Sequence, residues 1–280
     1  MGRLQNSIEL FKASWAMLRQ DKELFVLPVL SGIASLATIG LFAVPILATL
    51  DGGSTLAGEA SGGAGPVTYV LTALLYVTLA FITVFFNSAL VHGANERMSG
   101  GDPTVASALS GAASRLNRIL SWAIVSATVS FVIRQIQERA GFLGAVLGFL
   151  GGLAWAAVTF LVLPILVIEN VGVVDALKRS AGLLRTAWGE GLAGHLGLGL
   201  IGFLASLPFI AIGAVGILTG DVALVIITFV IAALGLVAVA VVMSALSVVY
   251  QTALYRYAIG QPVAAYRTEL MQSAFRPKRR

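Results

Sequence analysis

Long apolar stretches alternate with short charged segments along the chain, and this alternation predicts membrane-spanning helices. A helix needs about 20 apolar residues to cross the hydrocarbon core of a bilayer, and the strict alternation of a barrel strand is absent. We therefore expect an all-α integral membrane protein with six transmembrane helices in a single domain, 1–280. The expected spans are about 24–50, 67–92, 119–137, 141–168, 191–219 and 222–250.

A different pattern precedes each pair of spans, in which apolar residues recur three or four positions apart, as on one face of a helix. In 173–188, apolar and small residues share one face, while Asp175 and three basic residues lie opposite. Residues 9–19 show a similar arrangement, and 105–116 show a weaker one. Such helices suit the membrane surface, with the basic face toward lipid headgroups. The residues expected at the membrane interface are Lys12, Trp15, Arg19, Lys178, Arg179, Arg185 and Trp188.

Together these elements predict three repeats, each an amphipathic helix on the cytoplasmic side followed by a hairpin of two spans. The repeats begin near Ser7, Asp102 and Gly172. Each amphipathic segment also contains a serine followed five positions later by an arginine; these serines are Ser14, Ser110 and Ser180. In the third segment, the face expected to be buried contains Val173, Leu177, Ser180, Ala181, Leu184 and Trp188.

The composition supports a membrane protein, because 58% of the residues are hydrophobic, 11% are charged and the mean hydropathy is +0.93. Such a chain has too little polar surface to cover a soluble domain of this length. The absence of cysteine excludes disulfides, thiolate metal sites and cysteine nucleophiles.

The basic residues are distributed unevenly among the predicted loops. Of the 18 lysines and arginines, only Arg134 and Arg139 lie in a segment that the six-span topology places outside the cell. Because basic loops are retained in the cytoplasm, this distribution predicts a cell-membrane protein with both termini cytoplasmic. The basic amphipathic helices also favour contact with anionic lipids of the inner leaflet.

Few residues in the spans suggest chemistry. No acidic residue lies away from the span ends, which argues against a proton relay through buried carboxylates. Two histidines are too few for a typical metal site, and the polar residues of helices two and six suit either interhelical hydrogen bonds or a polar pocket. We expect no catalytic, metal-binding or cofactor-binding residue and no cofactor. The candidate pocket residues, near the cytoplasmic ends of their helices, are Asn87, His92, His195 and Gln251.

Glycine and proline positions indicate how the spans pack. Gly144, Gly148 and Gly152 recur at intervals of four, which allows another helix to approach closely. The glycine-rich segment beginning the fifth span fits either close packing or a flexible gate. Pro164 is expected to kink the fourth span. Pro208 leaves open a broken fifth helix, of the kind that forms sites in transporters.

Two regions carry a resemblance to other proteins. The residues are Ser7, Lys12, Ala13, Ser14, Trp15, Leu18, Asp21, Lys22, Glu23, Leu24, Pro28, Ser31 and Gly32, and then Pro164, Glu169, Lys178, Arg179, Ser180, Trp188 and Gly189. They resemble an uncharacterised family of six-helix prokaryotic membrane proteins, classified only as a domain of unknown function. The repeated plan is more loosely similar to the membrane domain of some glycerophosphodiester phosphodiesterases, but the catalytic barrel and its metal-binding acids are lacking here. Neither resemblance implies an active site.

The lack of a catalytic motif favours a protein that is not an enzyme. The first hypothesis is a non-catalytic scaffold or component of an envelope complex. The alternative is a transporter or lipid-handling protein, suggested by the threefold repeat, the glycine-rich fifth helix and Pro208. An enzyme acting on lipid headgroups ranks third. The expected partners are anionic inner-leaflet lipids and a membrane protein. Nucleic acid is not expected, since the basic tail is short and adjoins a span.

Overall fold

The computed structural model describes residues 12, 14–50, 65–139, 141–186 and 190–261, and every regular element within these ranges is helical. Six helical segments in this part of the chain are long and apolar enough to cross a membrane, which confirms the predicted fold class. The elements are η1 (Lys22–Phe25), α2 (Val26–Leu50), α3 (Pro66–Met98), α4 (Val105–Ala113), α5 (Leu116–Arg139), α6 (Gly141–Thr159), α7 (Val162–Ile168), α8 (Val173–Thr186), α9 (Glu190–Thr219) and α10 (Val222–Ala258).

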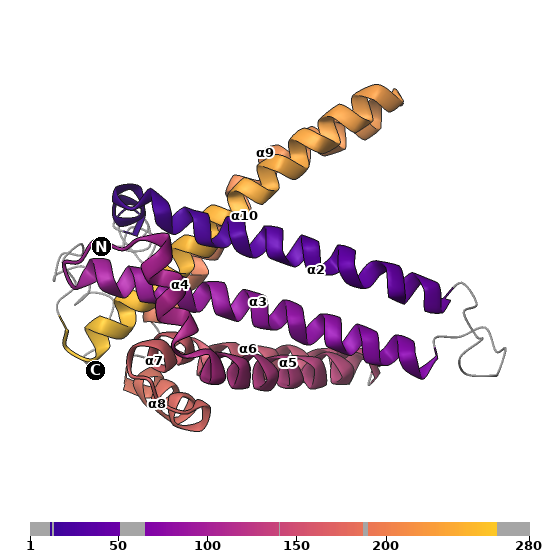
Figure 1. Cartoon of the computed structure of the whole chain (residues 1–280). Helices are drawn as coiled ribbons and strands as arrows, with labels where there is room; N and C mark the ends of the chain where they lie inside the picture. The colour runs from indigo at the N-terminus through magenta and orange to yellow at the C-terminus, as the bar shows by residue number, and fades with distance from the viewer. Residues whose placement is uncertain (1–11, 13, 51–64, 140, 187–189, 262–280) are drawn as a thin grey trace.

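The long helices pack in sequence order as three hairpins, α2 with α3, α5 with α6, and α9 with α10. Figure 1 shows the first two hairpins running side by side, while the third diverges from them at an angle. A short helical segment precedes each hairpin: residues 14–20, α4 and α8. These segments, together with α7, the start of α2 and the ends of α3 and α10, gather at one end of the molecule, which we call the polar end.

The hydrophobic core is concentrated at the polar end. Leu24, Leu90, Ile165 and Leu246 come from four different elements there and are fully buried. Large apolar side chains elsewhere along the spans are exposed, and Leu218 at the far end of α9 is 85% exposed. In a multi-pass membrane protein such surfaces contact acyl chains rather than water. The three hairpins are therefore joined to one another chiefly at one end.

Within the hairpins, glycines allow the paired helices to approach closely. A Cβ atom on Gly148 of α6 would collide with Gln137 of α5, so the close approach expected from the glycine spacing is observed there. On α10, Gly235 receives the ring of Phe209 from α9. Small residues opposite larger ones maximise dispersion contacts in a lipid environment, where no hydrophobic force drives helices together.

The fourth span is interrupted near its inner end, close to Pro164, where a kink was predicted. The helix ends at Thr159 and restarts at Val162. Pro164 has no amide hydrogen for the carbonyl of residue 160, and its ring clashes with that carbonyl, so the helical ladder breaks just before it. Pro208, by contrast, lies inside an uninterrupted α9. The broken fifth helix that Pro208 suggested is wrong for the described residues.

The second and sixth spans continue as helices beyond their predicted ends. The sequence placed these ends at His92 and Tyr250, where polar residues begin, but α3 reaches Met98 and α10 reaches Ala258. The polar side chains in these last turns, including the buried Arg256, find hydrogen-bond partners inside the polar end. The Arg256 guanidinium therefore has acceptors inside the protein, and α10 can continue with this charge buried.

The buried faces of the short helices agree in large part with the predicted ones. In α8, Ser180 is fully buried and Val173, Leu177 and Ala181 are half-buried, while Ala176, which was not on the predicted face, is buried beside them. In α4 the corresponding pair, four residues apart, is Ala108 and Ala112, while Ser110 is exposed. The shared serine–arginine spacing therefore does not mark equivalent positions in α4 and α8. Small residues lie against the bundle because the short helices pack closely on it.

Candidate functional site

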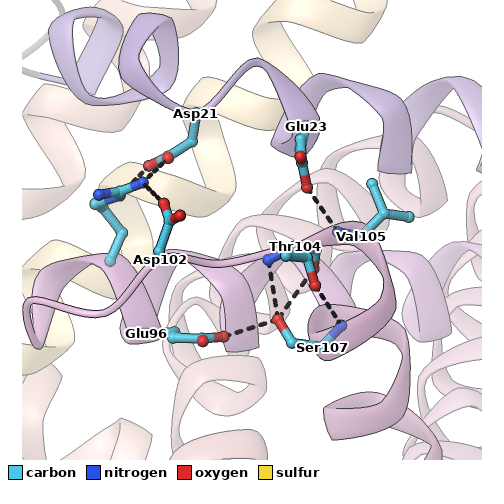
Figure 2. Close-up of polar contacts among 8 residues, drawn as sticks. Asp21, Glu23, Glu96, Asp102, Thr104, Val105 and Ser107 are labelled. Atoms are coloured by element: carbon cyan, nitrogen blue, oxygen red, sulfur yellow. Dashed lines mark hydrogen bonds and ion pairs between the residues drawn. The ribbon is translucent and has the colours of Figure 1, made fainter.

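An ion pair joins the segment before the first hairpin to the end of its second helix. The guanidinium of Arg97, in the last turn of α3, donates to both carboxylate oxygens of Asp21. Its Nη2 also donates to Asp102 Oδ1 at 2.6 Å. Figure 2 shows both carboxylates directed at the same guanidinium. The Asp21 side chain is only 4% exposed, so this two-point contact is sheltered from solvent.

The start of α4 is fixed by its own capping residues and by hydrogen bonds to two other parts of the polar end, η1 and α3 (Figure 2). The hydroxyl of Thr104 accepts from the amide of Ser107, and the hydroxyl of Ser107 accepts from the amide of Thr104. Glu23 accepts from the amide of Val105 at 3.1 Å, and Glu96 accepts from the Ser107 hydroxyl at 2.9 Å. These contacts satisfy amides that a helix start leaves unpaired, and they place acids where the helix dipole favours them.

Two neighbouring residues of α10 reach two different hairpins. The Arg256 guanidinium donates to the side-chain oxygen of Asn95 at 2.8 Å and to the Ser99 hydroxyl at 2.6 Å, both at the end of the first hairpin. The Tyr255 hydroxyl donates to Glu169 Oε1 at 2.5 Å, just after α7 of the second hairpin. Both α10 side chains are buried. The third hairpin is therefore bonded to the other two through adjacent positions.

The same acid extends this network to the amphipathic helix α8. Glu169 forms an ion pair with Arg179 in addition to its bond from Tyr255. One residue further along α8, the buried hydroxyl of Ser180 donates to the carbonyl of Val158 at 2.6 Å and accepts from the amide of Leu161 at 3.2 Å. Ser180 thereby satisfies backbone groups exposed by the break between α6 and α7. Helix α8 is thus held against the second hairpin at the point where that hairpin is interrupted.

The acids and arginines of this network serve to hold helices together. Asp21 and Glu169 are engaged by arginines, and Glu23 and Glu96 support the start of α4. In the part of the chain that the structure describes, no group of three or more histidine, aspartate or glutamate side chains is arranged to hold a metal ion. The name staple network is used below for the hydrogen bonds and ion pairs of the polar end described above. Its side chains are Asp21, Glu23, Asn95, Glu96, Arg97, Ser99, Asp102, Thr104, Ser107, Glu169, Arg179, Ser180, Tyr255 and Arg256.

The comparisons with known proteins place the chain in a family. The family of unknown function DUF6159 matches residues 66–264, which is more than half of the chain. The chain belongs to DUF6159. The membership confirms the resemblance to an uncharacterised family, whereas the looser similarity to glycerophosphodiester phosphodiesterase membrane domains is not shown. No curated protein matches the chain.

The DUF6159 match begins at Pro66, the first residue of α3, and includes most of the staple network. Arg97, Glu169 and Arg256 lie within it. Asp21 and Glu23 lie before it, so the ion pair between Asp21 and Arg97 joins the matched region to the segment that precedes it.

The residues of the candidate pocket in this DUF6159 chain are not joined by hydrogen bonds. Asn87, His92 and Gln251 are all half-buried, and in the described ranges no hydrogen bond links any of them to another. The His92 ring packs on Gly111 of α4, where a Cβ atom would collide with it. The side chain of His195 lies outside the described residues. The structure therefore gives His92 a packing role at the contact of α3 with α4.

The predicted interface residues have several different surroundings. Lys12, Arg19 and Lys178 are exposed, as expected for headgroup contacts. Trp15 packs edge-on against Phe25, with ring centroids 6.0 Å apart. Arg179 was expected to face headgroups, but it pairs with Glu169 because that acid ends α7 directly beside α8. The side chain of Arg185 and all of Trp188 lie outside the described residues.

Sequence reasoning did not identify Asp21, Arg97, Tyr255 or Arg256 as interacting residues. The one indication in the sequence was their position next to apolar spans. Acids and arginines at such positions need partners when the ends of the helices are buried. Their position could not specify the pairing, because the partners are far apart in sequence: Arg97 is 76 residues from Asp21, and Arg256 is 161 residues from Asn95.

Proposed function

We propose that this protein is a non-catalytic scaffold of the cell membrane and a component of an envelope complex, with both termini cytoplasmic. One observation carries the proposal: adjacent residues Tyr255 and Arg256 bond α10 to two other hairpins. The buried polar groups are thus used to fix the relative positions of helices. A buried polar or charged group is costly without its partner, so these contacts favour one position of α10 relative to both hairpins, which suits a protein whose role is to hold other components in place.

The arrangement of the third hairpin supports the same role. Helix α9 packs mainly against α10. The hairpin that they form diverges from the rest of the molecule (Figure 1). Phe203 of α9 and Phe229 of α10 are 58% and 62% exposed. A hairpin anchored at one end and apolar along its sides offers a neighbouring membrane protein two helices to pack against.

The cytoplasmic orientation is supported by charge. Arg134 and Arg139 belong to the last turns of α5, at the opposite end from the polar end, whereas Arg97, Lys178 and Arg256 belong to the polar end. Basic residues are retained on the cytoplasmic side of a membrane. The polar end and its staple network are therefore assigned to the cytoplasm.

The test compares complex formation with lipid transport. The full chain is extracted with its native membrane into polymer-bounded discs, and the mass of the particle is measured for wild type and for an Asn87→Leu, Gln251→Leu variant. A scaffold is expected to copurify with another membrane protein at a fixed ratio. Changing the two pocket candidates should leave that ratio unaltered, because neither takes part in the staple network.

The opposing result comes from proteoliposomes containing a fluorescent phospholipid. If the wild-type protein alone moves that lipid between leaflets and the Asn87→Leu, Gln251→Leu variant does not, the protein is lipid-handling and the scaffold proposal fails. Recovery of the wild-type protein without a stoichiometric protein partner also contradicts it.

A further inference from the structure

Two arginines at the start of α5 differ from the other basic residues of the polar end. Arg97, Arg179 and Arg256 each contact an acid or a side-chain acceptor on another element. Arg115 and Arg118 form no ion pair with any acid in the described part of the chain. Both are half-buried rather than extended into open surroundings.

The two side chains start from the same side of α5. Arg115 caps the helix, since its carbonyl accepts from the amides of Arg118 and Ile119, and residues three apart are neighbours on a helix surface. One turn beyond Arg118, on the same side, the buried Trp122 stacks on Trp155 of α6 with ring centroids 6.0 Å apart. The arginines therefore lie on the side of α5 that meets α6, level with the region where α6 ends.

The donors of these arginines are only partly satisfied. Arg115 Nη1 donates to the carbonyl of Gly111 at 3.0 Å and to the Ser114 hydroxyl at 3.2 Å. Arg115 Nε and Arg118 Nη1 are buried and have no hydrogen-bond partner in the described residues. A buried charged donor without an acceptor is costly. Because Arg115 and Arg118 are three residues apart at the start of α5, one anion within reach of both side chains would compensate both charges.

We propose that Arg115 and Arg118 bind a phosphate group. Guanidinium groups present planar pairs of donors that match phosphate oxygens, and the amino end of α5 adds a favourable dipole. The site does not depend on the scaffold role.

Binding is measured by native mass spectrometry of the full chain in detergent, with phosphatidylglycerol as the probe. An Arg115→Gln, Arg118→Gln variant is expected to bind the first phosphatidylglycerol about tenfold or more weakly, since it loses charge-assisted hydrogen bonds. The matched control is Lys22→Gln, Arg134→Gln, which removes the same charge from exposed positions that are not among the predicted headgroup contacts. The control should bind the first lipid as the wild type does. Equal losses in the two variants would overturn the proposal, because they would indicate attraction by surface charge alone.

Two further probes identify the source of the phosphate. Diacylglycerol with the same acyl chains lacks the phosphate and should not occupy the site. The proposal is contradicted if diacylglycerol binds as tightly as phosphatidylglycerol. Inorganic phosphate that displaces phosphatidylglycerol from the wild type supports a free phosphate ligand, whereas no displacement supports a lipid headgroup.

If the double glutamine variant fails to fold, the binding of phosphatidylglycerol is measured instead for an Arg115→Lys, Arg118→Lys variant. This variant keeps the charge but loses the paired donors, so weaker phosphatidylglycerol binding than in the wild type supports the site and unchanged binding overturns it.

Discussion

Replacing Asp21 by alanine is expected to lower the free energy of unfolding by about 3 kcal/mol, because removing one partner of a buried ion pair leaves the other charge uncompensated. The Asp21 side chain is 4% exposed, and its two carboxylate oxygens accept hydrogen bonds from Nε and Nη2 of Arg97. Unfolding in mixed detergent micelles, followed by the fluorescence of the four tryptophans, measures this change.

Asp102→Ala is the matched control for that substitution. Asp102 contacts the same guanidinium, but its side chain is 90% exposed. Exposed ion pairs contribute roughly 0–1 kcal/mol, so this variant should unfold almost as the wild type does. Equal destabilisation by the two substitutions would contradict a structural role that depends on the buried position of Asp21.

Replacing Gly235 by leucine is expected to destabilise the third hairpin by about 3 kcal/mol, at the upper end of the range for overpacked sites. Any Cβ atom at this position would collide with the ring of Phe209, so α9 and α10 would have to separate locally. The same unfolding measurement reports the loss.

Gly199→Leu provides the comparison on the same hairpin. No heavy atom lies within 4 Å of a Cβ atom built on Gly199, and the position is exposed. Leucine favours the helix over glycine by up to about 1 kcal/mol, so this variant should be unchanged or slightly more stable. Destabilisation of similar size at Gly199 and Gly235 would mean that helix packing at Gly235 is not the cause.

The spans were predictable because the thickness of the bilayer fixes the length of an apolar helix, whatever the rest of the fold does. The helix ends were not. Arg256 was read as part of the tail after the last span, and its burial depends on Asn95 and Ser99 from another hairpin. A local pattern cannot show that a distant side chain will satisfy a charge.

The short helices illustrate a second limit. The face predicted for α8 included Ser180, which is fully buried, but it did not include Ala176, which lies equally deep. Close helix contact selects for small size as well as for apolar character, and Ser180 is buried because it bonds to backbone groups at the α6–α7 break. That break follows from Pro164, but its contact with α8 is a property of the assembled fold.

The most direct test of the account is the side of the membrane on which the polar end lies. The chain contains no cysteine, so single substitutions can be labelled cleanly with a membrane-impermeant maleimide. Ser110→Cys and Gly182→Cys place the label on α4 and α8, and Glu138→Cys and Thr219→Cys place it at the far ends of α5 and α9. In intact cells, we expect labelling of the second pair alone, with the first pair becoming reactive after permeabilisation. Labelling of Ser110→Cys in intact cells would contradict a cytoplasmic polar end, and labelling of one member of either pair without the other would contradict the three-hairpin topology.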